Sequence, residues 1–214
     1  MAWRADPADP RLVTRWPLGR ATSLAADRTR LLATVDDAVY SVPLATGETV
    51  STTVGLAQAR RLALDGEKVY VAGRGGLRVV RWPVGGAPEV VGTYDGPDAT
   101  ALAVRGGLVA LGSDSGVDVL MGEGQRVGGV TTAAPVVDVA FLDDTLLVLD
   151  ASGRLDWFSL ADPAHAMLLA TAHALDNPSA LAVGDGYAAV TDLTAGLLLY
   201  RPVRGLLWLP FLSR

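Results

Sequence analysis

Short apolar segments recur at a regular distance along the chain. Five segments share one order: an apolar strand, a tight turn, a second apolar strand, a glycine-containing turn, a third strand and a more polar fourth strand. The central apolar positions of the five first strands are separated by 38, 40, 37 and 42 residues: Leu24, Leu62, Leu102, Val139 and Leu181. This period is close to the roughly 40 residues of a four-stranded propeller blade. The pattern therefore predicts an all-β propeller of about five four-stranded blades.

The residues between the segments agree with this interpretation. Pairs such as Asp65-Gly66 and Asp185-Gly186 tolerate the positive φ angles of two-residue hairpin turns. The second strands are almost continuously apolar, as expected for strands buried on both faces between neighbouring sheets. No stretch shows a helical period over 12 or more residues, which disfavours a βαβ architecture. A β-sandwich is the structural alternative, but about twenty strands in five copies fit a propeller better.

We interpret the whole chain, 1–214, as a single propeller domain. The expected repeats cover approximately 21–56, 57–97, 98–134, 135–177 and 178–214. Residues 11–18 align without gaps on the fourth strand that begins at Glu89, so we expect them to close the ring as the outer strand of the last blade. The alternative is that residues 205–212 form that outer strand. Pro210 weakens this alternative, because proline has no backbone amide to donate to the strand ladder.

One copy carries a family resemblance. Residues 62–81 read LALDGEKVYVAGRGGLRVVR and are followed by APEVVGTY at 87–94. This stretch resembles the LVIVD repeat of prokaryotic β-propeller proteins, and Asp-Pro links at Asp6-Pro7 and Asp162-Pro163 look like the links of that repeat. The resemblance implies the propeller fold in a bacterial protein. Many members have no known function and are surface or extracellular proteins, so no catalytic residue is carried over.

Composition and charge exclude several classes of protein. The net charge is −5 with no basic stripe, which argues against nucleic acid as a partner. The longest run without a charged residue, 163–175, has 13 residues, whereas a membrane-spanning helix needs about 20, so we expect no membrane insertion. The absence of cysteine excludes disulfides and thiolate metal sites. The N-terminus shows no apolar secretory segment, which predicts a cytoplasmic protein, or an extracellular one if the chain is a fragment.

Propellers bind ligands at the central channel or on the face formed by the loops that lead into the innermost strands. The candidate residues there are Arg60, Arg61, Asp138, His173 and Asp176. Asp138 interrupts an apolar first strand, so we expect it to line the channel or to be buried with a hydrogen-bond partner in a structural role. Arg60 and Arg61 could receive an anion, but adjacent strand residues usually point to opposite faces, with one solvated and one stacked.

The sequence offers little for catalysis. A hydrolase needs several converging carboxylates, and only one of the five first-strand cores contains an acidic residue. His165 and His173 are too few to hold zinc. The stretch Gly112-Ser-Asp-Ser-Gly116 is better explained as a turn than as a nucleophile or a calcium loop. Trp16, Trp82 and Trp157 are expected to pack between blades rather than to bind sugars.

These observations favour a non-enzymatic scaffold whose loop face engages a protein partner, without a cofactor or metal. The alternative is a lectin-like propeller that binds a small molecule or glycan, and a propeller hydrolase comes third. A protein partner calls for a contiguous apolar patch, a glycan for equivalent polar and aromatic residues in each blade, and an enzyme for clustered carboxylates in the channel.

Overall fold

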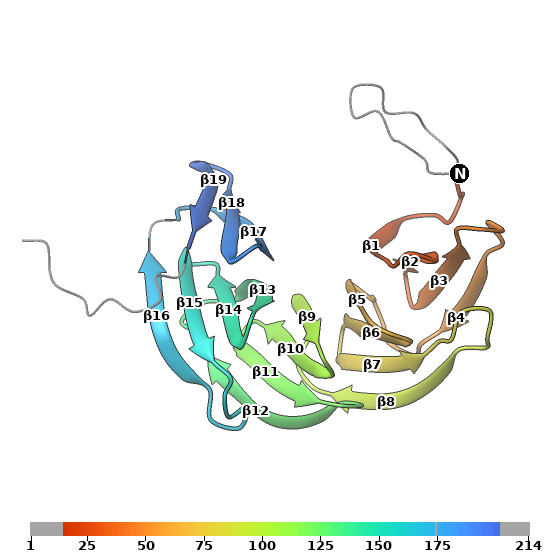
Figure 1. The fold of residues 1–214 in the computed structure, drawn as a ribbon, viewed down its shortest axis with the longest axis horizontal. Coiled ribbons are helices and arrows are strands. Elements are labelled where there is room, and N and C mark those ends of the chain that lie inside the picture. The colour runs from red at the N-terminus through yellow and green to blue at the C-terminus, as the bar shows by residue number, and fades with distance from the viewer. Residues whose placement is uncertain (1–14, 174, 202–214) are drawn as a thin grey trace, which may run out of the picture.

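The computed structural model describes residues 15–173 and 175–201, and these residues form five antiparallel sheets arranged along an arc (Figure 1). Four sheets have four strands and the last has three. The described residues contain no helix. The prediction of an all-β propeller with about five blades is confirmed.

Each blade is a meander in which consecutive strands pair. Blade 1 contains β1 (Ala21–Ala26), β2 (Arg30–Val35), β3 (Ala38–Pro43) and β4 (Val50–Thr53). Blade 2 contains β5 (Arg61–Asp65), β6 (Lys68–Gly73), β7 (Gly76–Arg81) and β8 (Glu89–Asp95). Blade 3 contains β9 (Ala101–Arg105), β10 (Leu108–Ser113), β11 (Gly116–Met121) and β12 (Gln125–Thr131). Blade 4 contains β13 (Val136–Leu142), β14 (Thr145–Asp150), β15 (Arg154–Ser159) and β16 (Met167–His173). Blade 5 contains β17 (Pro178–Gly184), β18 (Tyr187–Asp192) and β19 (Gly196–Tyr200).

The first strand of each blade lies innermost and the fourth strand lies on the outside of the arc (Figure 1). Two-residue turns join the first and second strands of blades 2 to 5, and three residues join those of blade 1. Asp185 and Gly186 both adopt positive φ, 48° and 76°, between β17 and β18. This backbone matches the twist of the flanking strands, and glycine and aspartate adopt it at low cost.

The apolar core lies between the blades. One cluster of buried side chains joins each pair of neighbouring sheets. Along β14, Leu146 and Val148 pack toward blade 3, whereas Leu147 and Leu149 pack toward blade 5. Strands of this kind are buried on both faces, which explains why the second strand of each repeat is almost continuously apolar.

Two of the three tryptophans expected between blades, Trp82 and Trp157, are found there, whereas Trp16 belongs to none of the interblade clusters. Trp82 is buried in the cluster between blades 1 and 2, and Trp157 in the cluster between blades 4 and 5. The turn interpretation of residues 112–116 is also confirmed, because β10 ends at Ser113 and β11 begins at Gly116 in one hairpin.

The expected closing strand is not observed. Residues 15–18, its described part, form no strand. The indole Nε1 of Trp16 instead donates a hydrogen bond of 3.3 Å to the carbonyl oxygen of Gly47, in the β3–β4 connection of blade 1. Blade 1 lies at the opposite end of the arc from β19 (Figure 1). Residues 11–14 and 205–212, which complete the two candidate closing segments, lie outside the described residues.

Candidate functional site

The edges of the innermost strands face one another around the arc, and polar side chains link them. Asp138 Oδ2 in β13 accepts a hydrogen bond of 2.9 Å from the backbone amide of Leu181 in β17. Ser23 Oγ in β1 accepts one of 3.1 Å from the amide of Leu62 in β5. Both polar residues immediately precede the central apolar position of their strand, and both bond the amide of that position in the next blade.

Asp138 is half-buried and hydrogen-bonded, so the expectation that it is not freely solvated is confirmed. Burial raises the pKa of its carboxyl group above the usual aspartate value, although amides of Leu181 and Val139 and the positive charge of Arg61 act in the opposite direction. Arg61 lies at the start of β5 with an exposed side chain. The structure therefore brings Arg61 within electrostatic reach of Asp138.

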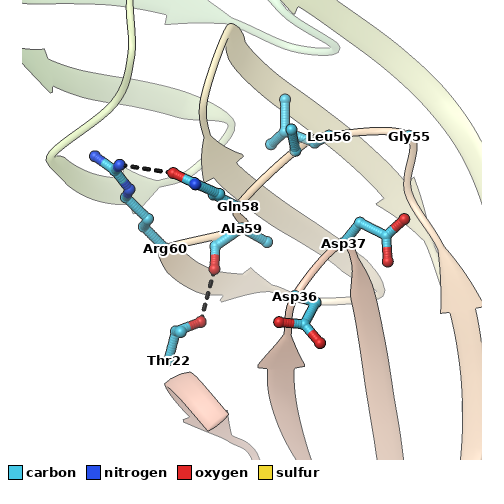
Figure 2. Close-up of a pocket in the computed structure, with 9 residues that line it drawn as sticks. Thr22, Asp36, Asp37, Gly55, Leu56, Gln58, Ala59 and Arg60 are labelled. Carbon is cyan, nitrogen blue, oxygen red and sulfur yellow. Dashed lines mark hydrogen bonds between the residues drawn. The ribbon is translucent and has the colours of Figure 1, made fainter. Parts of the chain in front are cut away.

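Arg60 lies at a different place, in a hollow of about 550 Å³ between blades 1 and 2. Figure 2 shows that Asp36 and Asp37 line this hollow on the other side of Ala59 from the Arg60 guanidinium group. Arg60 Nη2 donates a hydrogen bond of 2.9 Å to the side-chain oxygen of Gln58. The hollow thus combines one positive side chain, Arg60 from the loop between β4 and β5, with two negative ones, Asp36 and Asp37 from the turn between β2 and β3.

The wall of this hollow is fixed by a hydrogen bond between blades. Thr22 Oγ1 in β1 donates to the carbonyl oxygen of Ala59 over 2.6 Å, and Figure 2 shows this contact beside Arg60. In the same way, Thr100 Oγ1 at the start of blade 3 donates to the carbonyl oxygen of Val136 over 2.8 Å. We call these two contacts the threonine links, and each holds the chain where it enters the following blade, in the loop before β5 and at the first residue of β13.

His173 and Asp176 lie between blades 4 and 5. His173 is the exposed last residue of β16, and Asp176 is exposed in the loop that leads into β17. The carboxylate of Asp192 accepts hydrogen bonds from the amides of Ala195 and Asn177, which lower its pKa, and the neighbouring Asp176 amide contributes to the same effect. The five predicted residues therefore do not form one site: Arg61 and Asp138 interact, Arg60 lines the hollow, and His173 and Asp176 lie on a separate loop.

The structure also reveals a surface that the sequence analysis missed. One face of blade 5 lies against blade 4, and no core cluster of the described residues includes the other face. We define the blade 5 face as the side chains of Ala182, Tyr187, Ala189, Leu197 and Leu199. Three of them, Tyr187, Leu197 and Leu199, are large exposed apolar residues, and the face contains a shallow hollow of about 340 Å³. In the sequence, these residues alternate with buried ones along their strands. Every blade has this alternation, so it could not single out the face of blade 5 as exposed.

The described residues offer neither a metal centre nor a membrane-spanning helix. Within 15–173 and 175–201, no group of three or more His, Asp or Glu side chains could hold a metal ion. Nor does any helix in that part of the chain have the length and apolar character needed to cross a membrane.

The meander blades and the interblade cores define a β-propeller, and comparison with solved structures agrees. BamB from Moraxella catarrhalis superposes with a TM-score of 0.68 and 16% identity over 89% of this chain and 62% of that one. The WD40 β-propeller domain of Doa1 superposes with a TM-score of 0.67 and 18% identity, over 85% of this chain and 64% of that one. The β-propeller domain of Myceliophteria thermophila Cps50 (Swd1) superposes with a TM-score of 0.66 and 17% identity, over 85% of this chain and 69% of that one. The chain thus spans less than two thirds of the length of BamB.

No protein-family model matches the chain, so the resemblance to the LVIVD repeat is not confirmed. A search of curated proteins also finds no significant match. At these levels of sequence identity, the structural likeness establishes the fold alone.

Proposed function

We propose that this chain is a non-enzymatic propeller scaffold that binds a protein partner through the blade 5 face. The observation that carries the proposal is an exposed, contiguous apolar surface on one sheet. Large exposed apolar patches mark protein interaction sites on soluble domains. This location differs from the loop face that the sequence analysis favoured, because the hollow at Arg60 is lined by charged, polar and small residues with Leu56 as its one large apolar side chain.

The blade 5 face has the composition of a surface that other blades bury. By strand register, Leu197 corresponds to Leu155 and Leu199 corresponds to Trp157 in blade 4. Leu155 is 0% exposed and Trp157 8%, because blade 5 covers them, whereas Leu197 and Leu199 are each 65% exposed. Within the described part of the chain, the same type of surface is therefore buried core in blade 4 and exposed in blade 5.

Covering this face is energetically favourable. Complete burial of a leucine side chain contributes about 1.5 to 3 kcal/mol, and the two leucines lie beside the flat aliphatic surface of Ala182 and Ala189. Arg201 stacks over the Tyr187 ring, 5.5 Å from its centroid, and gives the face a charged rim. A partner that matches it presents apolar side chains from a strand or sheet and an acidic group near Arg201.

The alternative functions have weaker support. A glycan or small molecule would use the hollow at Arg60, but the turn residues Asp36 and Asp37 are replaced by Asp114 and Ser115 in blade 3, so the site is not repeated. A hydrolase would use carboxylates near the channel, and Asp138 is engaged in a bond between blades. The scaffold hypothesis accounts for the exposed apolar surface, which the other two leave unexplained.

The test compares Leu197→Arg/Leu199→Arg with Leu44→Arg, a control at an exposed leucine of blade 1. A protein captured from source-cell extract by the wild-type chain is purified and its Kd is measured for all three chains. We expect the double variant to bind at least about tenfold more weakly and the control to bind like wild type. Equal binding by the double variant would exclude the blade 5 face, and a wild-type mass of two chains in solution would identify a second copy as the occupant.

A further inference from the structure

The central apolar residue of each first strand packs toward the preceding blade. Leu62 belongs to the core between blades 1 and 2, Val139 to the core between blades 3 and 4, and Leu181 to the core between blades 4 and 5. Leu102 packs against the core between blades 2 and 3. The exposure of this position therefore reports whether a blade lies in front of it.

Leu24 occupies this position in blade 1, the first blade of the described residues. It lies opposite Ala33 of β2, as Leu62 lies opposite Val71 of β6. Leu24 is 62% exposed, whereas Leu62 is 8% exposed. Blade 1 therefore presents a large apolar side chain on the side where a preceding blade would lie.

The two ends of the arc thus lack neighbours on opposite sides. Among the described residues, four core clusters join successive blades, and none joins blade 5 to blade 1. Figure 1 shows these two blades at opposite ends of the arc. One end exposes the blade 5 face, which a following blade would bury, and the other exposes Leu24, which a preceding blade would bury. Both exposures have the same explanation, a ring in which further blades stand between blade 5 and blade 1.

The solved propellers indicate how many blades would complete the ring. The matched 85 to 89% of this chain covers 62 to 69% of BamB, Doa1 and Cps50. The part of each that has no counterpart here is about 80 to 120 residues, or two to three blades of roughly 40 residues. The residues of this chain outside the described part number 28, fewer than the shortest interval of 37 between equivalent positions of successive blades. A blade between blades 5 and 1 therefore needs residues beyond 1–214.

We propose that the protein partner supplies two or three four-stranded blades and completes a ring of seven or eight blades. The first of these blades packs on the blade 5 face, and the last packs on Leu24 of blade 1. Closure of this kind gives every blade a neighbour on both sides. The inference rests on the proposed binding to the blade 5 face and adds a second contact at the other end of the arc.

The test measures the Kd of the partner that is purified for the blade 5 experiment. It compares wild type, Leu24→Arg, Leu197→Arg/Leu199→Arg and Leu44→Arg, the control on the same blade as Leu24. All four leucines are exposed, so the variants should fold like wild type. We expect Leu24→Arg and the double variant each to bind at least about tenfold more weakly, and the control to bind like wild type.

The outcomes separate the ring from the binding face. A Leu24→Arg chain that binds like wild type, while the double variant binds weakly, would overturn the ring and leave the blade 5 face as the binding site. Unchanged binding by every variant, or the capture of no protein at all, would overturn both proposals. Wild-type assemblies of several chains that Leu24→Arg and the double variant each abolish would show instead that a second copy joins the two ends.

Two further measurements do not depend on the arginine variants. The chain contains no cysteine, so Leu24→Cys, Leu199→Cys and Leu44→Cys can each be labelled at one position with a maleimide. Binding of the partner should protect the first two cysteines and leave the third reactive. Limited proteolysis of the complex should leave a partner fragment of about 80 to 120 residues with the circular dichroism of β-structure. A helical fragment, or one shorter than about 40 residues, would overturn the inference.

Discussion

Asp138 in β13 binds the backbone amide of Leu181 in β17 through a hydrogen bond of 2.9 Å, and this bond joins the innermost strands of two blades. Ser23 and Leu62 form the same link between blades 1 and 2. Innermost strands belong to different sheets, so a side chain supplies the acceptor that a ladder partner would supply within a sheet. The polar residue that interrupts an apolar strand is therefore explained by the junction between blades.

Replacing Asp138 with alanine should destabilise the protein. The substitution leaves the Leu181 amide without its acceptor in a partly buried place, which costs about 1 to 3 kcal/mol. The measurement is the free energy of unfolding from urea denaturation at neutral pH. The control is Arg61→Ala, an exposed side chain whose removal should change stability by less than about 0.5 kcal/mol. Equal effects of the two variants would show that the bond to Leu181 contributes little.

The pH dependence of stability should also report on Asp138. Burial raises the pKa of this carboxyl group in the folded protein. The folded state then holds the proton more tightly than the unfolded state. The stabilisation by Asp138 is therefore greatest below the unfolded pKa of about 3.9 and falls as the pH rises through the folded pKa.

The comparison chain for this titration is Asp138→Asn, which retains an oxygen acceptor but does not ionise. The free energy of unfolding of wild type relative to Asp138→Asn should decrease between about pH 3 and pH 7. An increase over that range would contradict the expectation, because it would mean that the amide hydrogen bonds and the attraction to Arg61 outweigh burial.

The threonine link at Thr22 predicts that removing its hydroxyl group lowers stability more than removing the hydroxyl group of Ser179, the equivalent residue of blade 5. Thr22 donates to Ala59 of the following blade and also contacts Thr34 within its own blade, Oγ1 to Oγ1 at 2.9 Å. Ser179 makes the corresponding contact with Thr191 at 2.8 Å but lies in the last described blade. Thr22→Ala should therefore cost about 1 kcal/mol more than Ser179→Ala in thermal or urea unfolding. Equal costs would indicate that the bond between blades adds no stability.

Most of the fold could be predicted from the sequence, because the turns and strands of each repeat are determined by residues close together in the chain. Turn pairs such as Asp185-Gly186 fix the hairpins, and the double-sided burial of strands such as β14 forces a continuous apolar run. The bonded state of Asp138 could also be predicted, since a carboxylate within an apolar strand needs a partner.

The ends of the arc could not be predicted in the same way. Leu155 and Leu197 occupy equivalent positions and are both leucine, yet one is a core residue and the other is exposed. Exposure here depends on whether a neighbouring sheet exists, and no local pattern contains that information. For a related reason, the match of residues 11–18 to the strand at Glu89 could not reveal that residues 15–18 form no strand and that the Trp16 indole bonds Gly47 of blade 1.

Two glycines separate the cost of an unusual backbone angle from the cost of a steric clash. Gly153 and Gly186 have similar φ angles, 82° and 76°, so alanine at either position is strained by about 1 to 2 kcal/mol. A Cβ at Gly186 would meet nothing within 4 Å, whereas a Cβ at Gly153 would lie 1.7 Å from the carbonyl oxygen of Leu175. Leu175 belongs to the buried core between blades 4 and 5, so its backbone cannot move away freely.

Gly153→Ala should therefore lower stability far more than Gly186→Ala. We expect Gly186→Ala to remain folded with a loss of about 1 to 2 kcal/mol, and Gly153→Ala to lose at least about 2 kcal/mol more or to separate the two blades. Near-ultraviolet circular dichroism of Trp157, whose ring packs edge-on against Tyr200 at 5.9 Å, reports on that junction. If both variants unfold at the same urea concentration with unchanged spectra, the loop carrying Leu175 adapts to the added methyl group, and the close approach of the two backbones does not hold the junction together.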